Sequence, residues 1–162
     1  MKTTNTMVLF WGGKFSQWYP HDMEIDGVVY NCCEQYMMAE KARLFNDTEA
    51  LAKIMVSDDP RTQKAIGRTV KGFNAPMWEK VCRDIVFRAN MAKFSDPDMK
   101  SYLLAFGEKE IVEASPYDTI WGIGLGEEDP RALDKAQWQG TNWLGEAIMQ
   151  VRETFKNATT IS

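Results

Sequence analysis

An acid and a lysine at helical spacing are the residues of this chain whose types first suggest chemistry. Glu34, Met38 and Lys41 stand at i, i+4 and i+7 within residues 30–45, so they share one face of a predicted helix. A carboxylate and an amine beside an apolar stripe form a candidate site at the edge of a core. Asn31 is the expected N-cap of this helix. The structural alternative is that Glu34 only caps the helix, at its positive end, and that Lys41 is solvated. The pattern alone favours the structural alternative.

A second group surrounds the glycine-rich segment W-G-I-G-L-G at 121–126. Gly122 and Gly124 would let the backbone approach a ligand, and several N–H groups could then face a phosphate. Asp118 and Trp121 would orient a polar ring and stack on it. The segment is not G-x-G-x-x-G and does not open directly into a helix, which excludes a Rossmann dinucleotide site. A tight bend after a strand is the structural alternative.

Further polar and aromatic residues have structural alternatives of their own. Arg68 would meet a phosphate, although a helix C-terminus attracts cations anyway. Trp78 lies on the apolar stripe of a long predicted helix, and its spacing favours the core. Asn142 is favoured as the cap of the last helix. These residues by themselves do not single out one reaction.

Composition excludes several classes of function. A formal net charge of −4 over 162 residues gives no support to broad electrostatic binding of nucleic acid. The single histidine, His21, excludes a two-histidine zinc site and leaves carboxylates and lysines to move protons. Three cysteines, two of them adjacent, make a poor disulfide framework and favour the reducing cytoplasm. Neither a signal peptide nor a membrane-spanning segment is expected.

The elements that must position these residues are mostly helices. Strands are expected at 7–10 and 110–114, with a hairpin at 23–30 around Asp26-Gly27. Helices are expected to start near Asn31, after Asp47, at Asp59-Pro60, at 74–76, at 96–97 and at 141–142. The segment 127–140 is expected to be a surface loop and the residues after Lys156 a polar tail. The pattern predicts an α+β fold, helix-rich with a few short strands, in a single domain over residues 1–162.

Many spaced matches in the same order identify a family. They include F-S-Q-W-Y-P at 15–20, C-E-Q-Y-M-M at 33–38, W-G-I-G-L at 121–125 and V-R-E at 151–153. Shorter matches stand between them, at Lys41, Gly67-Arg68, Trp78, Lys93-Phe94, Asp118 and Asn142. The chain resembles the NADAR family (NAD- and ADP-ribose-associated proteins), which includes the YbiA-like proteins. The resemblance covers about residues 9–156 and agrees with a helix-rich α+β fold.

The resemblance implies an N-glycosidase, which cleaves the bond between a ribose anomeric carbon and a nitrogen. It implies a small nucleotide-type substrate carrying ADP-ribose or ribose phosphate, no metal or other cofactor, and no obligate protein partner. Family resemblance makes Glu34, Lys41 and Asp118 the catalytic candidates. It makes Arg68, Trp78, Trp121, Gly122, Gly124 and Asn142 the ligand-binding candidates.

The resemblance leaves three activities open. The F-S-Q-W-Y-P and W-G-I-G-L motifs and the inserted residues 127–137 favour removal of ADP-ribose from guanine, with ADP-ribosylated DNA as a candidate partner. Hydrolysis of phosphoribosylamino intermediates of riboflavin synthesis is the second hypothesis. A non-catalytic module that binds ADP-ribose and leaves it intact is the third.

Overall fold

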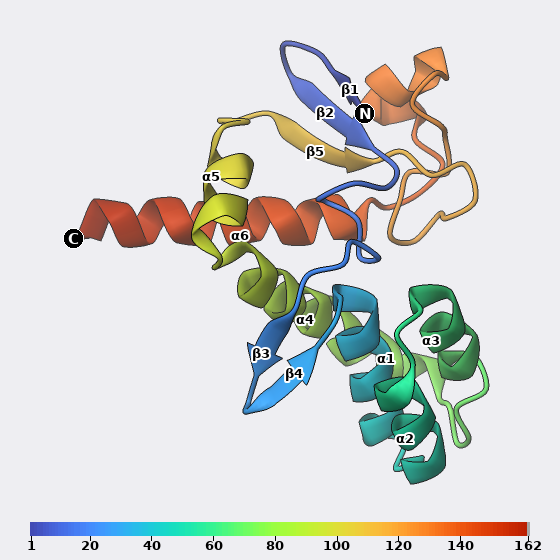
Figure 1. The fold of residues 1–162 in the computed structure, drawn as a ribbon. Helices are drawn as coiled ribbons and strands as arrows, with labels where there is room; N and C mark the ends of the chain where they lie inside the picture. Colours follow the sequence, from blue (N-terminus) through green and yellow to red (C-terminus); the bar gives the residue numbers. More distant parts are fainter. Residues whose placement is uncertain (162) are drawn as a thin grey trace. The chain divides into compact units, whose positions relative to one another are not determined.

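The computed structural model describes the backbone of residues 1–161 and the side chains of residues 1–158. The chain divides into two compact units, which are described separately below. The central unit comprises residues 17–93, and the terminal unit comprises residues 1–16 and those from 94 onward. Six α-helices and a few short strands make up the described residues (Figure 1), in agreement with the predicted α+β class. A single domain over residues 1–162 stays a prediction.

The central unit begins with the hairpin that Asp26-Gly27 predicts. β3 (Met23–Ile25) pairs antiparallel with β4 (Val28–Tyr30), and Met23 lies opposite Tyr30. Asp26 and Gly27 have φ angles of 52° and 82°. Positive φ at both central residues matches the right-handed twist of the two strands, which explains why an Asp-Gly pair is favoured there.

Three helices pack together after the hairpin. They are α1 (Cys33–Leu44), α2 (Thr48–Val56) and α3 (Pro60–Gly67). As predicted, Asp47 caps α2 by accepting from the Ala50 N–H at 3.0 Å, and Asp59 caps α3 with a proline in its first turn. Residues 33–39 of α1 are all buried, so this helix is enclosed on most sides.

The predicted start of α1 is wrong. Cys32 occupies the N-cap position without a side-chain cap, which makes Glu34 the second helical residue. The Asn31 side chain instead donates to the Asp58 carbonyl at 3.1 Å and accepts from Gln63 Nε2 at 3.1 Å. Gln35 Oε1 accepts from the Asn31 N–H at 2.8 Å. Asn31 therefore ties α1 to the start of α3 and does not cap α1.

The long helix α4 (Ala75–Phe94) begins where predicted. Asn74 Oδ1 accepts from the Met77 N–H at 3.0 Å, which satisfies one of the donors left open at a helix start. Its predicted stripe contributes to the core through Cys82, Ile85 and Ala89. Trp78 is only half-buried, so the core position that its spacing favoured is only partly correct.

The terminal unit contains a three-stranded sheet in the order β1-β2-β5. β1 (Lys2–Thr3) runs antiparallel to β2 (Met7–Phe10), and β2 runs parallel to β5 (Glu110–Glu113). α5 (Pro97–Leu104) precedes β5, and α6 (Trp143–Ile161) packs on it. The predicted polar tail after Lys156 is wrong, because α6 continues to Ile161.

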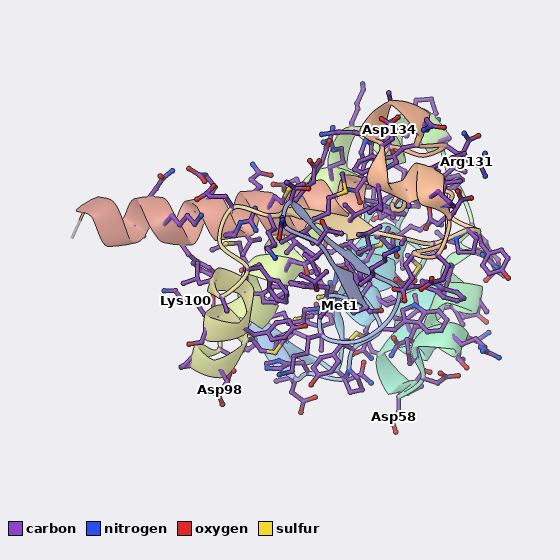
Figure 2. The ribbon with its side chains drawn as sticks, turned by 90° about the horizontal axis from the view of Figure 1, so that it is seen from above. Met1, Asp58, Asp98, Lys100, Arg131 and Asp134 are labelled. Carbon is purple, nitrogen blue, oxygen red and sulfur yellow. The ribbon has the colours of Figure 1, made fainter. Side chains whose placement is uncertain are left out.

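Residues 127–140 are more than the predicted surface loop. They contain two 3-10 helices, η1 (Pro130–Leu133) and η2 (Lys135–Gln137). Ala132 is fully buried against a cluster that includes Leu9 and Val112, and its carbonyl accepts from Trp138 Nε1 at 2.8 Å. The charged side chains of Arg131 and Asp134 point outward (Figure 2). These charges explain why the sequence predicts a surface loop and gives no sign of the buried Ala132.

The start of α6 is locked onto β5 by two residues. Asn142, at φ 53°, donates from Nδ2 to the Ile111 carbonyl at 3.0 Å and accepts at Oδ1 from the Glu113 N–H at 3.0 Å. A Cβ on Gly145 would collide with the Ile111 carbonyl oxygen and the Asn142 side chain. Asn142 is therefore a bridge to the strand, whereas the sequence favoured a helix cap.

We expect Gly145→Ala to destabilise the protein by about 3 kcal/mol, at the upper end for overpacking, because the Ile111 carbonyl and the doubly hydrogen-bonded Asn142 side chain cannot easily move away. Gly126→Ala is the matched control, since a Cβ at Gly126 meets nothing within 4 Å. Urea unfolding measures both. Equal stability of the two variants would contradict the predicted collision.

Candidate functional site

The sequence-predicted site residues fall into two groups, one in each unit. Glu34, Lys41, Arg68 and Trp78 belong to the central unit. The other group belongs to the terminal unit and consists of Asp118, Trp121, Gly122, Gly124 and Asn142. Each group is described within its own unit, and the prediction that both act on one substrate stays a prediction.

Lys41 is the centre of the first group. Its Nζ lies 4.6 Å from the ring centroid of Phe73 and 5.7 Å from that of Trp78, within the range of cation–π attraction. Burial lowers the pKa of Lys41, the negative charge of Glu34 raises it, and the positive charge of Arg68 lowers it further. Lys41 is therefore a half-enclosed amine with an acid and an arginine nearby, and the solvated lysine of the structural alternative is wrong.

Glu34 is buried, with 5% of its surface exposed. It is the second residue of α1, where the helix dipole favours a carboxylate, and its backbone N–H donates to the Gln17 carbonyl at 3.0 Å. Burial raises the pKa values of the neighbouring Cys32 and Cys33 thiols, and the charge of Glu34 adds a smaller rise. Glu34 is therefore a buried carboxylate whose charge raises the pKa of Lys41, and it is not merely an exposed charge at a helix end.

Lys93 is a buried lysine that residue patterns did not single out. It is fully buried, and burial lowers the pKa of its amine, while the Cys33 and Cys32 thiols oppose this shift. Burial in turn raises the pKa of Cys33. On the same helix, Asn90 donates to Gln17 Oε1 at 2.9 Å. Only the family match at Lys93-Phe94 drew attention to this residue, because a lysine in a helix is usually solvated.

Arg68 and Trp78 remain accessible. Arg68 follows α3 as its C-cap and is exposed, so its guanidinium can reach a ligand. Trp78 is half-buried in the first turn of α4, with its ring toward Lys41. Both residues can therefore contact a bound molecule beside Lys41.

In the terminal unit, Asp118 organises the glycine-rich segment. Its Oδ1 accepts from the Ile120 N–H at 2.9 Å and from the Trp121 N–H at 2.8 Å. The Trp121 ring meets Trp143 edge to face, with centroids 5.7 Å apart. One carboxylate oxygen is thus committed to the turn that holds Trp121.

The two glycines of this group are required by close approach and by backbone angle. A Cβ on Gly122 would lie 2.9 Å from the Glu113 carbonyl oxygen, and Gly124 has a φ of 71°. The Asn142 side chain is 1% exposed and bonded to β5 through both its oxygen and its nitrogen. That geometry gives Asn142 a positioning role, and direct contact with a ligand stays a prediction.

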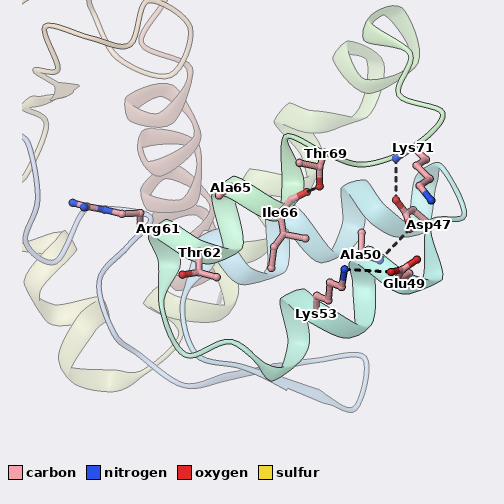
Figure 3. A pocket seen from close by; sticks show the side chains of 10 residues that line it. All are labelled: Asp47, Glu49, Ala50, Lys53, Arg61, Thr62, Ala65, Ile66, Thr69 and Lys71. Atoms are coloured by element: carbon pink, nitrogen blue, oxygen red, sulfur yellow. Dashed lines mark hydrogen bonds and ion pairs between the residues drawn. The ribbon is translucent and has the colours of Figure 1, made fainter.

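A groove of about 500 Å³ lies on α2 and α3, and none of the predicted site residues is among those that line it. Figure 3 shows the side chains that line it, several of which are engaged with one another. Lys53 pairs with Glu49 at 3.2 Å, and Asp47 accepts from the Ala50 and Lys71 N–H groups. These polar groups hold α2 and the loop after α3, so we do not place the candidate site there.

Among the described residues, no group of three or more His, Cys, Asp or Glu side chains is arranged to hold a metal ion. In the same part of the chain, no helix has both the length and the apolar character needed to cross a membrane.

Comparison with known proteins identifies the family. The NADAR domain model matches residues 9–156, and the chain belongs to the NADAR family. N-glycosidase R617 of Acanthamoeba polyphaga mimivirus is 43% identical over 86% of this chain and 85% of its own length. The chloroplastic riboflavin biosynthesis protein PYRR of Zea mays is 31% identical over 86% of this chain, which corresponds to 23% of that protein.

The solved structure of the Escherichia coli protein YbiA has the same fold. It superposes with a TM-score of 0.79 over 98% of this chain and 90% of YbiA, at 24% sequence identity. This likeness bears out the helix-rich α+β fold class. The names of the relatives support an N-glycosidase of the NADAR family.

We expect Asp118→Asn to preserve the turn, because an amide oxygen can still accept from the Ile120 and Trp121 N–H groups. Asp118→Ala removes both hydrogen bonds and should lower the free energy of unfolding by about 1–2 kcal/mol. Thermal unfolding of the two variants measures the difference. If both lose the same stability, the predicted acceptor role of Asp118 is wrong.

A pH dependence follows from the buried Lys93. Its pKa lies below the ordinary 10.5, so the unfolded chain binds a proton that the folded protein lacks. The free energy of unfolding should therefore rise with pH above the lowered pKa, until the Cys33 thiol opposes the rise near its ordinary value of 9.0. Urea unfolding at several pH values below 9.0 should give K93M a shallower slope than the unsubstituted protein. Identical slopes would contradict this.

Proposed function

We propose that this protein is an N-glycosidase that hydrolyses a ribose–nitrogen bond and removes ADP-ribose from guanine in DNA or nucleotides. The observation that carries the proposal is the surroundings of Lys41. The rings of Phe73 and Trp78 lie 4.6 and 5.7 Å from this half-buried amine, and the charges of a buried acid, Glu34, and an exposed arginine, Arg68, act on its pKa. Such a set can hold a flat heterocycle, an anionic phosphate and a sugar that develops positive charge.

The chemistry assigns Glu34 the first role. As the bond between the anomeric carbon and the nitrogen breaks, the electron pair leaves with the base and positive charge develops on the ribose ring. A carboxylate beside that ring stabilises the charge or removes a proton from the attacking water. Water supplies the new oxygen at the anomeric carbon, and the base leaves with a proton. Burial of Glu34 strengthens its effect, because little water screens it.

Lys41 and Arg68 have two alternative uses. As cations they would hold the phosphates of the substrate. Alternatively, the lowered pKa of Lys41 increases the fraction of neutral amine, which is a nucleophile for the anomeric carbon or its open-chain aldehyde. In either case Asp118 is the second candidate acid, and Trp78 or Trp121 would stack on the base or the ribose.

The guanine-linked substrate is favoured by the sequence motifs. The chain is 43% identical to the viral N-glycosidase R617 and 27% identical to YbiA of Escherichia coli, so it is more similar to R617 than to YbiA. The net charge of −4 suits recognition of one modified nucleotide over a grip on a long duplex. ADP-ribosylated DNA would then be a partner only at the modified base, with the cytoplasm as the expected compartment.

Hydrolysis of phosphoribosylamino riboflavin intermediates is the second candidate function. It is favoured by the match to the riboflavin biosynthesis protein PYRR. Both substrate classes place a ribose–nitrogen bond next to a flat ring and phosphate. The same cluster could also serve a module that binds ADP-ribose and leaves it intact.

One experiment separates the three functions. The purified protein is incubated with DNA that carries ADP-ribosylated guanine and, separately, with aminopyrimidine riboside phosphate. Release of ADP-ribose supports the proposal, release of ribose phosphate supports the second function, and tight binding of ADP-ribose without turnover supports the third. Absence of ADP-ribose release from the guanine adduct would overturn the proposal.

We expect Glu34→Gln to fold normally and to lose hydrolysis by about 100-fold or more, since a lost charge stabiliser costs roughly 3 kcal/mol in the barrier. Glu40→Gln is the matched control: Glu40 lies on the same helix and forms a half-exposed ion pair with Arg43 at 3.2 Å. Product release by chromatography and thermal unfolding are measured for both. An active, folded E34Q protein would remove Glu34 from the chemistry.

A further inference from the structure

The loop between α3 and α4 presents an aromatic ring that sequence patterns did not single out. Phe73 lies on this loop with 48% of its surface exposed, although its ring centroid is only 4.6 Å from Lys41 Nζ. Phe45 supports the ring edge to face, with centroids 5.5 Å apart and an interplanar angle of 71°. The ring therefore contacts Phe45 and Lys41, and about half of the surface of Phe73 stays accessible to a ligand.

The loop that carries this ring is fixed to the rest of the central unit. Asp47 accepts from the Ala50 N–H with Oδ1 and from the Lys71 N–H with Oδ2, at 3.0 and 2.9 Å (Figure 3). The neighbouring Gly72 has a φ of 77°, which a residue with a side chain rarely adopts. One carboxylate thus joins the start of α2 to the segment just before Phe73.

The position of Phe73 relative to Lys41 limits what the ring can contact. If Glu34 and Lys41 act at the anomeric carbon, the heterocycle bonded to that carbon is the nearest flat part of the substrate. Trp78 is the other ring beside Lys41, at 5.7 Å from its Nζ. A partly exposed phenyl ring can stack on any base, because every base has a π-face.

We propose that Phe73 is a substrate-contacting specificity residue that stacks on the leaving heterocycle. This inference rests on the proposed function and adds the part of the substrate that the central unit recognises. The stacking persists from the bound substrate to the departing base, so it acts mainly on binding. A fused purine offers more stacking area than a single pyrimidine ring, and Phe73 therefore favours guanine over an aminopyrimidine.

The test compares variants at one position. Phe73→Leu keeps an apolar side chain and removes the π-face, whereas Phe73→Tyr keeps the ring and is the matched control. Dissociation constants are measured for guanosine monophosphate, which has the heterocycle, and for ribose 5-phosphate, which lacks it. We expect F73L to weaken binding of guanosine monophosphate about tenfold, within the range for base–aromatic stacking. Binding of ribose 5-phosphate should be unchanged, and F73Y should match the unsubstituted protein.

Two results would overturn the inference. One is equal weakening of both probes by F73L, which indicates a general effect on Lys41 and its phosphate contacts. The other is no weakening at all, or no binding of guanosine monophosphate to the unsubstituted protein. Thermal unfolding of each variant identifies any loss of fold. These binding measurements need no turnover, so absence of hydrolysis overturns the proposed function separately.

A second measurement determines KM and kcat of F73L with the ADP-ribosylated guanine substrate. F73L should raise KM by about tenfold and change kcat little, because uniform binding acts on KM. A fall in kcat at constant KM would place Phe73 in the chemical step and contradict a stacking role.

Discussion

Burial of the first half of α1 is the constraint on which the central unit depends. Residues 33–39 are enclosed, and this stretch includes the acid Glu34. A buried charge is costly unless polar groups interact with it, and Lys41 is one such group for Glu34. Lys41 feels the charge of Glu34 directly, and Lys93 lies beside the thiols at the same helix start. The same helix, α1, therefore contributes both to the core and to the candidate site.

Local signals in the sequence predicted local structure well. Asp26-Gly27 predicted the hairpin turn, and Asp47 and Asp59 predicted two helix starts, because each acts on backbone within three residues. Asn31 has the same kind of side chain but failed as a predicted cap. Its partners, Asp58 and Gln63, lie 27 and 32 positions away, and no rule about neighbouring residues reveals them.

In the candidate site, too, the sequence predicted contacts between residues close in the chain and missed contacts between distant ones. Helical spacing placed Glu34 and Lys41 on one face, but it could not show that Phe73 and Trp78 enclose the amine. Family resemblance supplied Arg68 and Trp78, for which spacing favoured structural roles. In residues 127–140, outward charges concealed the buried Ala132, since the surface of a short helix dominates its composition.

The Asp47 carboxylate accepts two hydrogen bonds, one from the first turn of α2 and one from the loop before Phe73. Both segments therefore depend on one ionisable group. Accepting from the Lys71 and Ala50 N–H groups lowers the pKa of this carboxyl below 3.8. Its contribution to folding is therefore complete above 3.8 and disappears as acid brings the pH through the lowered value. Protonation of this one carboxylate weakens both hydrogen bonds, so acid acts on the first turn of α2 and on the loop before Phe73 together.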